Sequence, residues 1–156
     1  MREFNQPSET FGPYDPGGPV DIPDRSTAAR QTAVAIEDAI RRDVLETGVF
    51  VASDGRELLR RTGQPDRVRY LVSELAVMAG TTFVHNHPGR AGPSVDDVVL
   101  AAEFGLHELR VVTDLFRYAV MGMTNVSIDN IQAAYHEMES KLAAQLREQV
   151  RLGSLH

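Results

Sequence analysis

The sequence contains no cysteine, which excludes disulfide bridges and thiolate-ligated metal sites. It also has no apolar run of membrane-spanning length, and its N-terminus lacks the basic-then-apolar pattern of a secretory signal. No internal repeat is evident along the chain. These absences predict a cytoplasmic protein with no membrane partner.

Positive charge is also scarce, because 16 Lys and Arg residues stand against 22 Asp and Glu residues, for a formal net charge of −6. This acidic balance, without any basic and aromatic-rich segment, argues against nucleic acid as a partner. The chain of 156 residues is 42% hydrophobic and 24% charged. These values are typical of one globular domain that is large enough to bury a core.

The proline and glycine content divides the chain into segments. Residues 1–25 hold five of the eight prolines, so we expect an arm without regular structure. That arm is either a disordered tail or a segment that lies across a partner or the substrate groove. Residues 26–123 are expected to form the folded domain, and residues 124–156 a C-terminal helix. This last helix either covers the core or pairs with a second copy of the chain.

The hydrophobic pattern predicts an α/β protein of the α+β type, with a mixed central sheet. Helices are expected at its N-terminus, after the histidine motif described below and at its C-terminus. Turn residues and helix-capping residues set the expected ends of the helices and strands. The expected helices span residues 26–45, 74–79, 94–104 and 128–152, and the expected strands span residues 46–52, 57–61, 82–84, 109–113 and 116–121.

The most informative segment begins with the strand Thr82–Val84. His85 and His87 follow it two residues apart, so their side chains are expected to point to the same side. Prolines and glycines then predict a turning loop, after which Ser94 caps a helix with Asp97 at its third position. The loop folds this helix start back towards the strand end. Two imidazoles and one carboxylate are a common ligand set for catalytic zinc, with a fourth position left for water.

Two simpler interpretations compete with a metal site. Ser94 and Asp97 also form an ordinary helix-capping arrangement. The sequence His85-Asn86-His87 also resembles the motif of HNH nucleases. An HNH active site needs further metal and phosphate ligands, however, and the sequence does not place them. The strand spacing of the histidines, the adjacent turn and the carboxylate at the next helix start together favour metal binding.

The pattern His85-x-His87 followed by Ser94-x-x-Asp97 resembles the signature of the JAMM (MPN-plus) metalloprotease superfamily. The local sequence His85-Asn86-His87-Pro88 is most similar to the RadC-like and phage- or toxin-associated bacterial branch of this superfamily. The resemblance covers roughly residues 28–123. One departure is the short connection of six residues between His87 and Ser94, where the family usually has more. The resemblance implies a cytidine-deaminase-like/MPN fold and a zinc cofactor.

The resemblance also implies the role of each site residue. His85, His87 and Asp97 would hold Zn²⁺, and Ser94 would stabilise the oxyanion. Glu46, at a helix–strand junction and shortly before Gly48, would be the general base. Two further carboxylates compete for that role, but Glu57 is expected on a solvated hairpin edge, and Glu74 complements a helix N-terminus. His107 is expected to be a surface residue.

The implied activity is hydrolysis of a peptide or isopeptide bond in a protein or peptide substrate, which could be ubiquitin-like. Two alternatives stay open. The domain could be a non-catalytic binding or assembly module, or a RadC-like protein linked to DNA processing.

Overall fold

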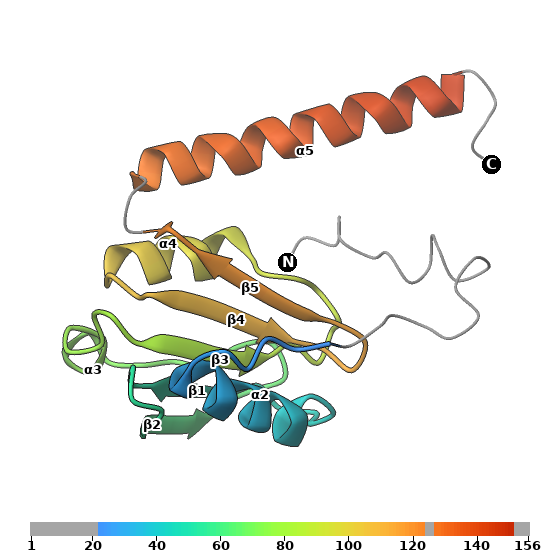
Figure 1. Cartoon of the computed structure of the whole chain (residues 1–156). Coiled ribbons are helices and arrows are strands. Elements are labelled where there is room, and N and C mark those ends of the chain that lie inside the picture. Colours follow the sequence, from blue (N-terminus) through green and yellow to red (C-terminus); the bar gives the residue numbers. More distant parts are fainter. Residues whose placement is uncertain (1–21, 124–126, 152–156) are drawn as a thin grey trace.

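The computed structural model describes residues 22–123 and 127–151. Its centre is a five-stranded sheet in the order β2-β1-β3-β4-β5, as Figure 1 shows. The β3–β4 pair is parallel and the other pairs are antiparallel, so the sheet is mixed. The predicted α/β class with a mixed central sheet is confirmed. The strands are β1 (Thr47–Val51), β2 (Glu57–Thr62), β3 (Thr82–Asn86), β4 (Glu108–Val112) and β5 (Arg117–Met121).

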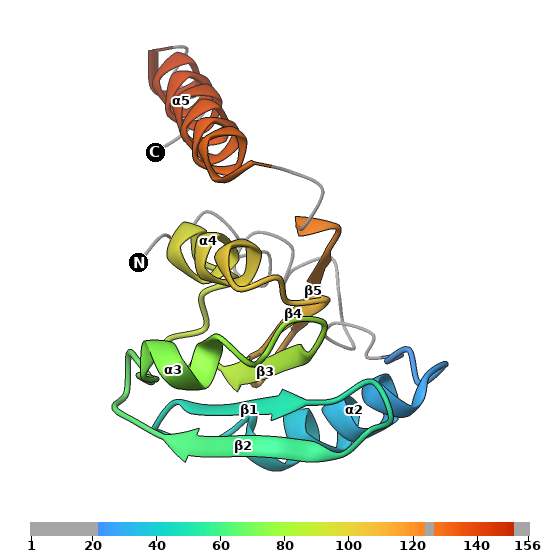
Figure 2. The same cartoon turned by 90° about the vertical axis from the view of Figure 1, so that its left-hand side faces the viewer.

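Helix α2 (Ala28–Ile40) covers one face of the sheet, as Figures 1 and 2 show. It begins at Thr27, whose hydroxyl accepts the backbone N–H of Arg30 at 3.1 Å. The helix packs on β1 and β3 through a small apolar core. That core comprises Ala33, Ile36, Ile40, Val49, Val51, Val84 and Val112. The small side chain of Ala33 permits the close approach of helix and sheet.

The larger core lies on the opposite face of the sheet, beneath α3 (Val72–Leu75) and α4 (Val95–Glu103). Because strand side chains alternate between faces, Phe50 and Phe83 point here while their neighbours Val49 and Val84 face α2. Helix α4 forms the crossover between the parallel strands β3 and β4, and therefore begins beside the C-terminal end of β3. That end of the sheet carries the histidine motif.

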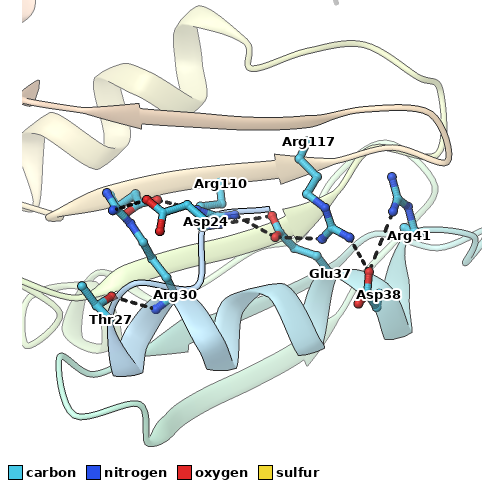
Figure 3. Close-up of polar contacts among 9 residues, drawn as sticks. Asp24, Thr27, Arg30, Glu37, Asp38, Arg41, Arg110 and Arg117 are labelled. Atoms are coloured by element: carbon cyan, nitrogen blue, oxygen red, sulfur yellow. Dashed lines mark hydrogen bonds and ion pairs between the residues drawn. The ribbon is translucent and has the colours of Figure 1, made fainter. Parts of the chain in front are cut away.

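A layer of charged side chains fills the space between α2 and strands β4 and β5 (Figure 3). Glu37 is fully buried and accepts from Arg110 at 2.9 and 3.2 Å and from Arg117 at 3.2 Å. Arg110 also donates to Glu108 at 2.6 Å, and Arg30 reaches the same carboxylate at 3.3 Å. Part of this interface is therefore ionic rather than apolar, which the hydrophobic pattern did not predict.

Helix α5 (Ile128–Arg151) contacts α4 and then extends beyond it, as both views show. Ile131 is buried and Tyr135 packs against the larger core, whereas Met138 is 48% exposed. In the described part of the chain, no helix has the length and apolar character needed to cross a membrane. The predicted arm lies outside the described residues up to position 21, and so do residues 124–126 and 152–156.

Two predicted helices have the wrong bounds. Helix α2 ends at Ile40 rather than near Leu45, and Val44, which lies within the predicted range, is 77% exposed. The chain must reverse direction between α2 and β1, and that turn uses residues 41–45. The short helix predicted at residues 74–79 spans Val72–Leu75 instead, so it begins earlier, after Leu71, and ends four residues sooner. The carboxylate of Glu74 accepts the Leu71 N–H at 2.9 Å and so caps the helix.

Candidate metal centre

The end of β3 places the two histidines on one side, as their spacing predicts. The Nε2 atoms of His85 and His87 lie 3.0 Å apart, with the rings steeply inclined at 73°. His85 belongs to the strand, and His87 extends its ladder by donating its N–H to the Val112 carbonyl at 2.9 Å. Both side chains are almost fully buried. The backbone therefore fixes the positions of both rings.

The loop after His87 returns the chain to the histidines at the start of α4. Ser94 is the N-cap, and its hydroxyl accepts the Asp97 N–H at 3.1 Å. This places Asp97 Oδ2 at 3.2 Å from His85 Nε2 and 3.3 Å from His87 Nε2. The six-residue connection is thus long enough to bring Asp97 to both rings. Capping and site formation use the same residues, so the two interpretations of this pair are compatible.

The same loop sets the tautomer of His87. His87 Nδ1 lies 2.9 Å from the Ala91 carbonyl oxygen, which can only accept, so Nδ1 carries a hydrogen. In the neutral ring, the lone pair is then on Nε2, which faces His85 and Asp97. Arg90 adopts a left-handed backbone with φ of 67°, and its guanidinium is fixed by Asp114 at 2.7 and 3.0 Å. This bent loop is what presents the Ala91 carbonyl to the ring.

Glu46 reaches the histidines from the residue before β1. Its backbone exchanges hydrogen bonds with Gln64 and Gly63 at 2.8 Å, which extends the β1–β2 ladder by one step. The side chain is almost fully buried, and its Oε1 lies 3.8 Å from His85 Nε2. Glu46, His85 and His87 form a buried group whose ligand atoms lie within 4.8 Å of one another and could hold a metal ion.

Asn86, between the two histidines, holds the Glu46 segment against β3. Its side chain is fully buried on the α2 side of the sheet. Its Oδ1 accepts the Thr47 N–H at 2.7 Å, and its Nδ2 donates to the carbonyls of Leu45 at 3.0 Å and Asp43 at 3.3 Å. The sequence alone did not decide between a brace for the loop and a contact behind the ligands. Its place between two candidate ligands was the only sequence feature that pointed to such a brace.

The electrostatics of the site follow from this burial. Burial raises the pKa of Glu46, and the two histidines only partly offset that rise. For Asp97, burial acts in the same direction, but the attraction of His85 and His87 prevails and holds the pKa of Asp97 well below its usual value. Burial opposes protonation of His87, yet the hydrogen bond and charge of Asp97 raise the pKa of this histidine. Asp97 is therefore an anion, whereas Glu46 is easier to protonate.

The donor set fits a zinc ion. Zinc binds imidazole nitrogen and carboxylate oxygen at about 2.0–2.2 Å, so tetrahedral ligand atoms lie about 3.3–3.5 Å apart. The three edges of the triangle formed by His85, His87 and Asp97 measure 3.0, 3.2 and 3.3 Å, so they are at or slightly below this spacing. Two of its corners, His87 Nε2 and Asp97 Oδ2, present lone pairs. A cation at the centre would satisfy both.

Among the remaining candidate residues, Ser94 contacts the cluster through Asp97. The Ser94 hydroxyl accepts from Asp97 and keeps its own hydrogen free to donate. The carboxylate of Glu57 pairs with Arg60 at 2.5 Å, and that of Glu74 pairs with Arg61 at 2.7 Å, so neither is directed to the histidines. His107 is exposed, as predicted. Of the three candidate bases, only Glu46 joins the cluster.

A cavity of about 410 Å³ opens beside His87 at this end of the sheet. Its walls come from the turn after α2, the His87 loop and the turn after β4. They comprise Arg41, Arg42, Asp43, Val44, His87, Pro88, Arg90 and Asp114. The size is within the range of small-ligand pockets, so part of a peptide chain could enter.

No family model matches the chain, and searches of curated proteins and of solved structures found no significant match. The function must therefore be inferred from the geometry of the site.

Proposed function

We propose that the protein is a zinc-dependent peptidase or isopeptidase of the JAMM (MPN-plus) type, with a cytidine-deaminase-like MPN fold. One observation carries the proposal. Ligand atoms of His85, His87 and Asp97 form a triangle of zinc-site dimensions, and a buried carboxylate, Glu46, lies 3.8 Å from one corner. Three protein ligands are the number at which catalytic zinc sites retain a position for water.

A bound zinc ion would lower the pKa of a water molecule and polarise the substrate carbonyl. Glu46 would accept a proton from the attacking water and return it to the leaving amine. The raised pKa of Glu46 suits this role, because a base whose pKa is closer to the working pH both takes up and releases a proton. Ser94 donates its free hydroxyl hydrogen to the oxyanion that develops on the carbonyl.

The substrate proposed is a protein or peptide that enters beside His87, with a ubiquitin-like protein as one candidate. The cavity supports the proposal because it lies beside His87 and its size suits part of an extended chain.

Metal analysis of three purified proteins tests the proposal. The parent and Glu46→Gln should each contain one zinc per chain, whereas His87→Ala should contain none. Of these three proteins, only the parent should cleave a panel of ubiquitin-like fusions and generic peptides. Glu57→Gln is a matched control that should behave as the parent does, because its carboxylate pairs with Arg60 away from the site. A zinc content that survives His87→Ala would refute the ligand assignment, and zinc without any cleavage would favour the binding-module alternative.

We also propose that α5 pairs with a second copy of the chain. The extension of α5 beyond α4 and the exposure of Met138 on its apolar stripe support this. Sedimentation of the parent should show a dimer and Met138→Glu a monomer. A monomeric parent at high concentration would leave α5 as a cover for the core alone.

A further inference from the structure

Two buried polar atoms next to the centre have no hydrogen-bond partner among the described residues. They are His85 Nδ1 and the Tyr70 hydroxyl, and the Tyr118 hydroxyl is a third such atom. The second ring nitrogen of a metal-ligating histidine almost always has a partner, which fixes the tautomer and the ring orientation. His87 has the Ala91 carbonyl for this purpose. His85 therefore lacks a contact that its neighbour has.

The Tyr70 hydroxyl lies over Gly48, in space that a larger residue there would fill. Gly48 is the register partner of His85 across the β1–β3 pair. A Cβ atom at Gly48 would come within 2.4 Å of the Tyr70 hydroxyl and 2.8 Å of the Phe83 ring. Any larger residue at position 48 would thus displace one ring or the other. The phenol occupies the space next to the imidazole that a side chain at this position would otherwise fill.

The Tyr70 ring is held from several sides. It lies edge-on to Phe50 and Phe83, with centroids at 5.1 and 5.8 Å and planes at 82° and 87°. The Arg61 guanidinium carbon lies 5.1 Å from the ring centroid, and Glu74 fixes that guanidinium at 2.7 and 2.8 Å. The hydroxyl therefore has a fixed direction.

The aromatic cluster around Tyr70 continues to the metal centre. Phe83 stacks on Phe50, with ring centroids 4.6 Å apart, and on His85, with ring centroids 4.8 Å apart and planes at 15°. One packed unit thus holds both the phenol and the His85 imidazole, so their relative position is set by the core.

We propose that Tyr70 is a positioning residue of the metal centre, whose hydroxyl is joined to His85 Nδ1 through one buried water. This inference rests on the proposed function for the role of His85 as a ligand. Directly opposite residues in an antiparallel pair have Cβ atoms about 4.5–5.5 Å apart, so the hydroxyl above Gly48 is within one water of the imidazole. A buried water needs two to four polar partners, and the two unpartnered atoms supply two.

The bridge gives His85 Nδ1 a partner whichever ring nitrogen carries the hydrogen. Without an ion, His85 Nε2 faces the Asp97 carboxylate at 3.2 Å and the lone pair of His87 Nε2 at 3.0 Å, so Nε2 carries the hydrogen and Nδ1 accepts from the water. With zinc held by Nε2, Nδ1 would donate its hydrogen to the same water. Burial raises the pKa of Tyr70, with Glu74 and Glu46 adding to the rise against the pull of Arg61, so the phenol stays neutral. Tyr70 acts on the metal only through His85.

Two matched substitutions test the proposal, since each removes one buried hydroxyl that has no partner among the described residues. Tyr118 lies on the far side of His85 in the sheet, because His85 pairs with Val111 and Val111 with Tyr118. Zinc affinity is measured by competition with a chelator, and the hydrogen bond at His85 Nδ1 by the ¹⁵N chemical shift of that nitrogen in the metal-free protein. Tyr70→Phe should weaken zinc binding about 10–100-fold and move the His85 Nδ1 resonance towards that of a nitrogen that accepts no hydrogen bond. Tyr118→Phe should change neither.

The outcomes separate this proposal from the proposed function. An unchanged His85 Nδ1 resonance and an unchanged zinc affinity in Tyr70→Phe overturn the positioning role, even if the parent binds zinc and cleaves peptides. The positioning role is also overturned if these changes appear in Tyr118→Phe and not in Tyr70→Phe. If the parent binds no zinc, the proposed function fails, and the NMR shift of His85 in Tyr70→Phe still decides whether the bridge exists. Gly48→Ala, which displaces the phenol, should reproduce the His85 shift without removing the hydroxyl.

Discussion

Asn86 Oδ1 accepts the backbone N–H of Thr47 at 2.7 Å, and this contact ties the histidine strand to the segment that carries Glu46. Two further hydrogen bonds from the Asn86 amide, to the carbonyls of Leu45 and Asp43, complete the brace. The proposed base immediately precedes β1, whereas the two histidine ligands lie at the end of β3. Their relative position is set by a residue on the opposite face of the sheet from both.

Removing this brace should affect catalysis more than metal binding. In Asn86→Ala, the backbone groups of Thr47 and Leu45 lose buried partners, which costs about 1–3 kcal/mol of unfolding free energy. A base displaced by about 1 Å costs roughly 100-fold in rate. We expect kcat to fall while zinc affinity stays within a few-fold of the parent, as measured by steady-state kinetics and chelator competition. Equal losses in both quantities would show that Asn86 supports the ligands instead.

Glu46→Gln should abolish hydrolysis and yet stabilise the metal-free protein. The folded state raises the pKa of Glu46, so the ionised carboxylate disfavours folding at any pH above its unfolded value. That cost disappears as the pH falls through the raised pKa. We expect metal-free Glu46→Gln to melt above the parent at pH 7, with the difference shrinking near pH 4, and kcat to drop about 10²–10⁴-fold. A variant that melts below the parent at pH 7 would contradict this role of the carboxylate.

The ion pair between Arg61 and Glu74 should make the difference in stability between the parent and Glu74→Gln depend on pH. Hydrogen bonds from Arg61 and from the Leu71 N–H lower the pKa of Glu74 to about 2. A carboxyl group with a depressed folded pKa contributes stability that is fully present above its unfolded value of about 4.5 and is lost as the pH falls through about 2. Glu74→Gln should therefore unfold at lower denaturant concentration than the parent at pH 7, with convergence towards pH 2. A difference that is independent of pH would rule out the ionised pair as its source.

Removing a single charge from the buried ionic layer under α2 should lower the free energy of unfolding strongly. Glu37→Ala leaves Arg110 and Arg117 without the carboxylate that both contact, and breaking such a buried pair typically costs about 3–5 kcal/mol. Asp38 is a matched control on the same helix, because it also contacts Arg117 but its side chain is 51% exposed. Asp38→Ala should cost about 1 kcal/mol or less in urea unfolding. Similar losses for the two variants would show that burial does not set the energetics of this layer.

The sequence predicted the elements that carry the site because their patterns are local. Strand spacing sufficed to place His85 and His87 on one side, and the capping preference of Ser94 marked the start of α4. The end of α2 was misplaced because no glycine or proline follows Ile40 at once, and Val44 continues the apolar period although the chain has already turned. Periodicity alone does not contain the tertiary constraint that ends this helix.

The long-range contacts of the site could not be read from spacing. The position of Tyr70 over Gly48 depends on the register of β1 with β3 and on the path of the loop after β2. The alternation of Glu108 and Arg110 with apolar residues in β4 was a local sign of a polar layer. Arg110 pairs with Glu37, which lies 73 residues away in the sequence, and only the packing of α2 reveals this pairing.

The most direct test of the proposed metal centre is an anomalous difference map at the zinc absorption edge from crystals grown with one equivalent of zinc. We predict a single peak at about 2.0–2.2 Å from His85 Nε2, His87 Nε2 and a carboxylate oxygen of Asp97, with Glu46 beside the ion but not bound to it. A map without a peak at this end of the sheet, or a peak held by Glu46 with Asp97 turned away, would contradict it.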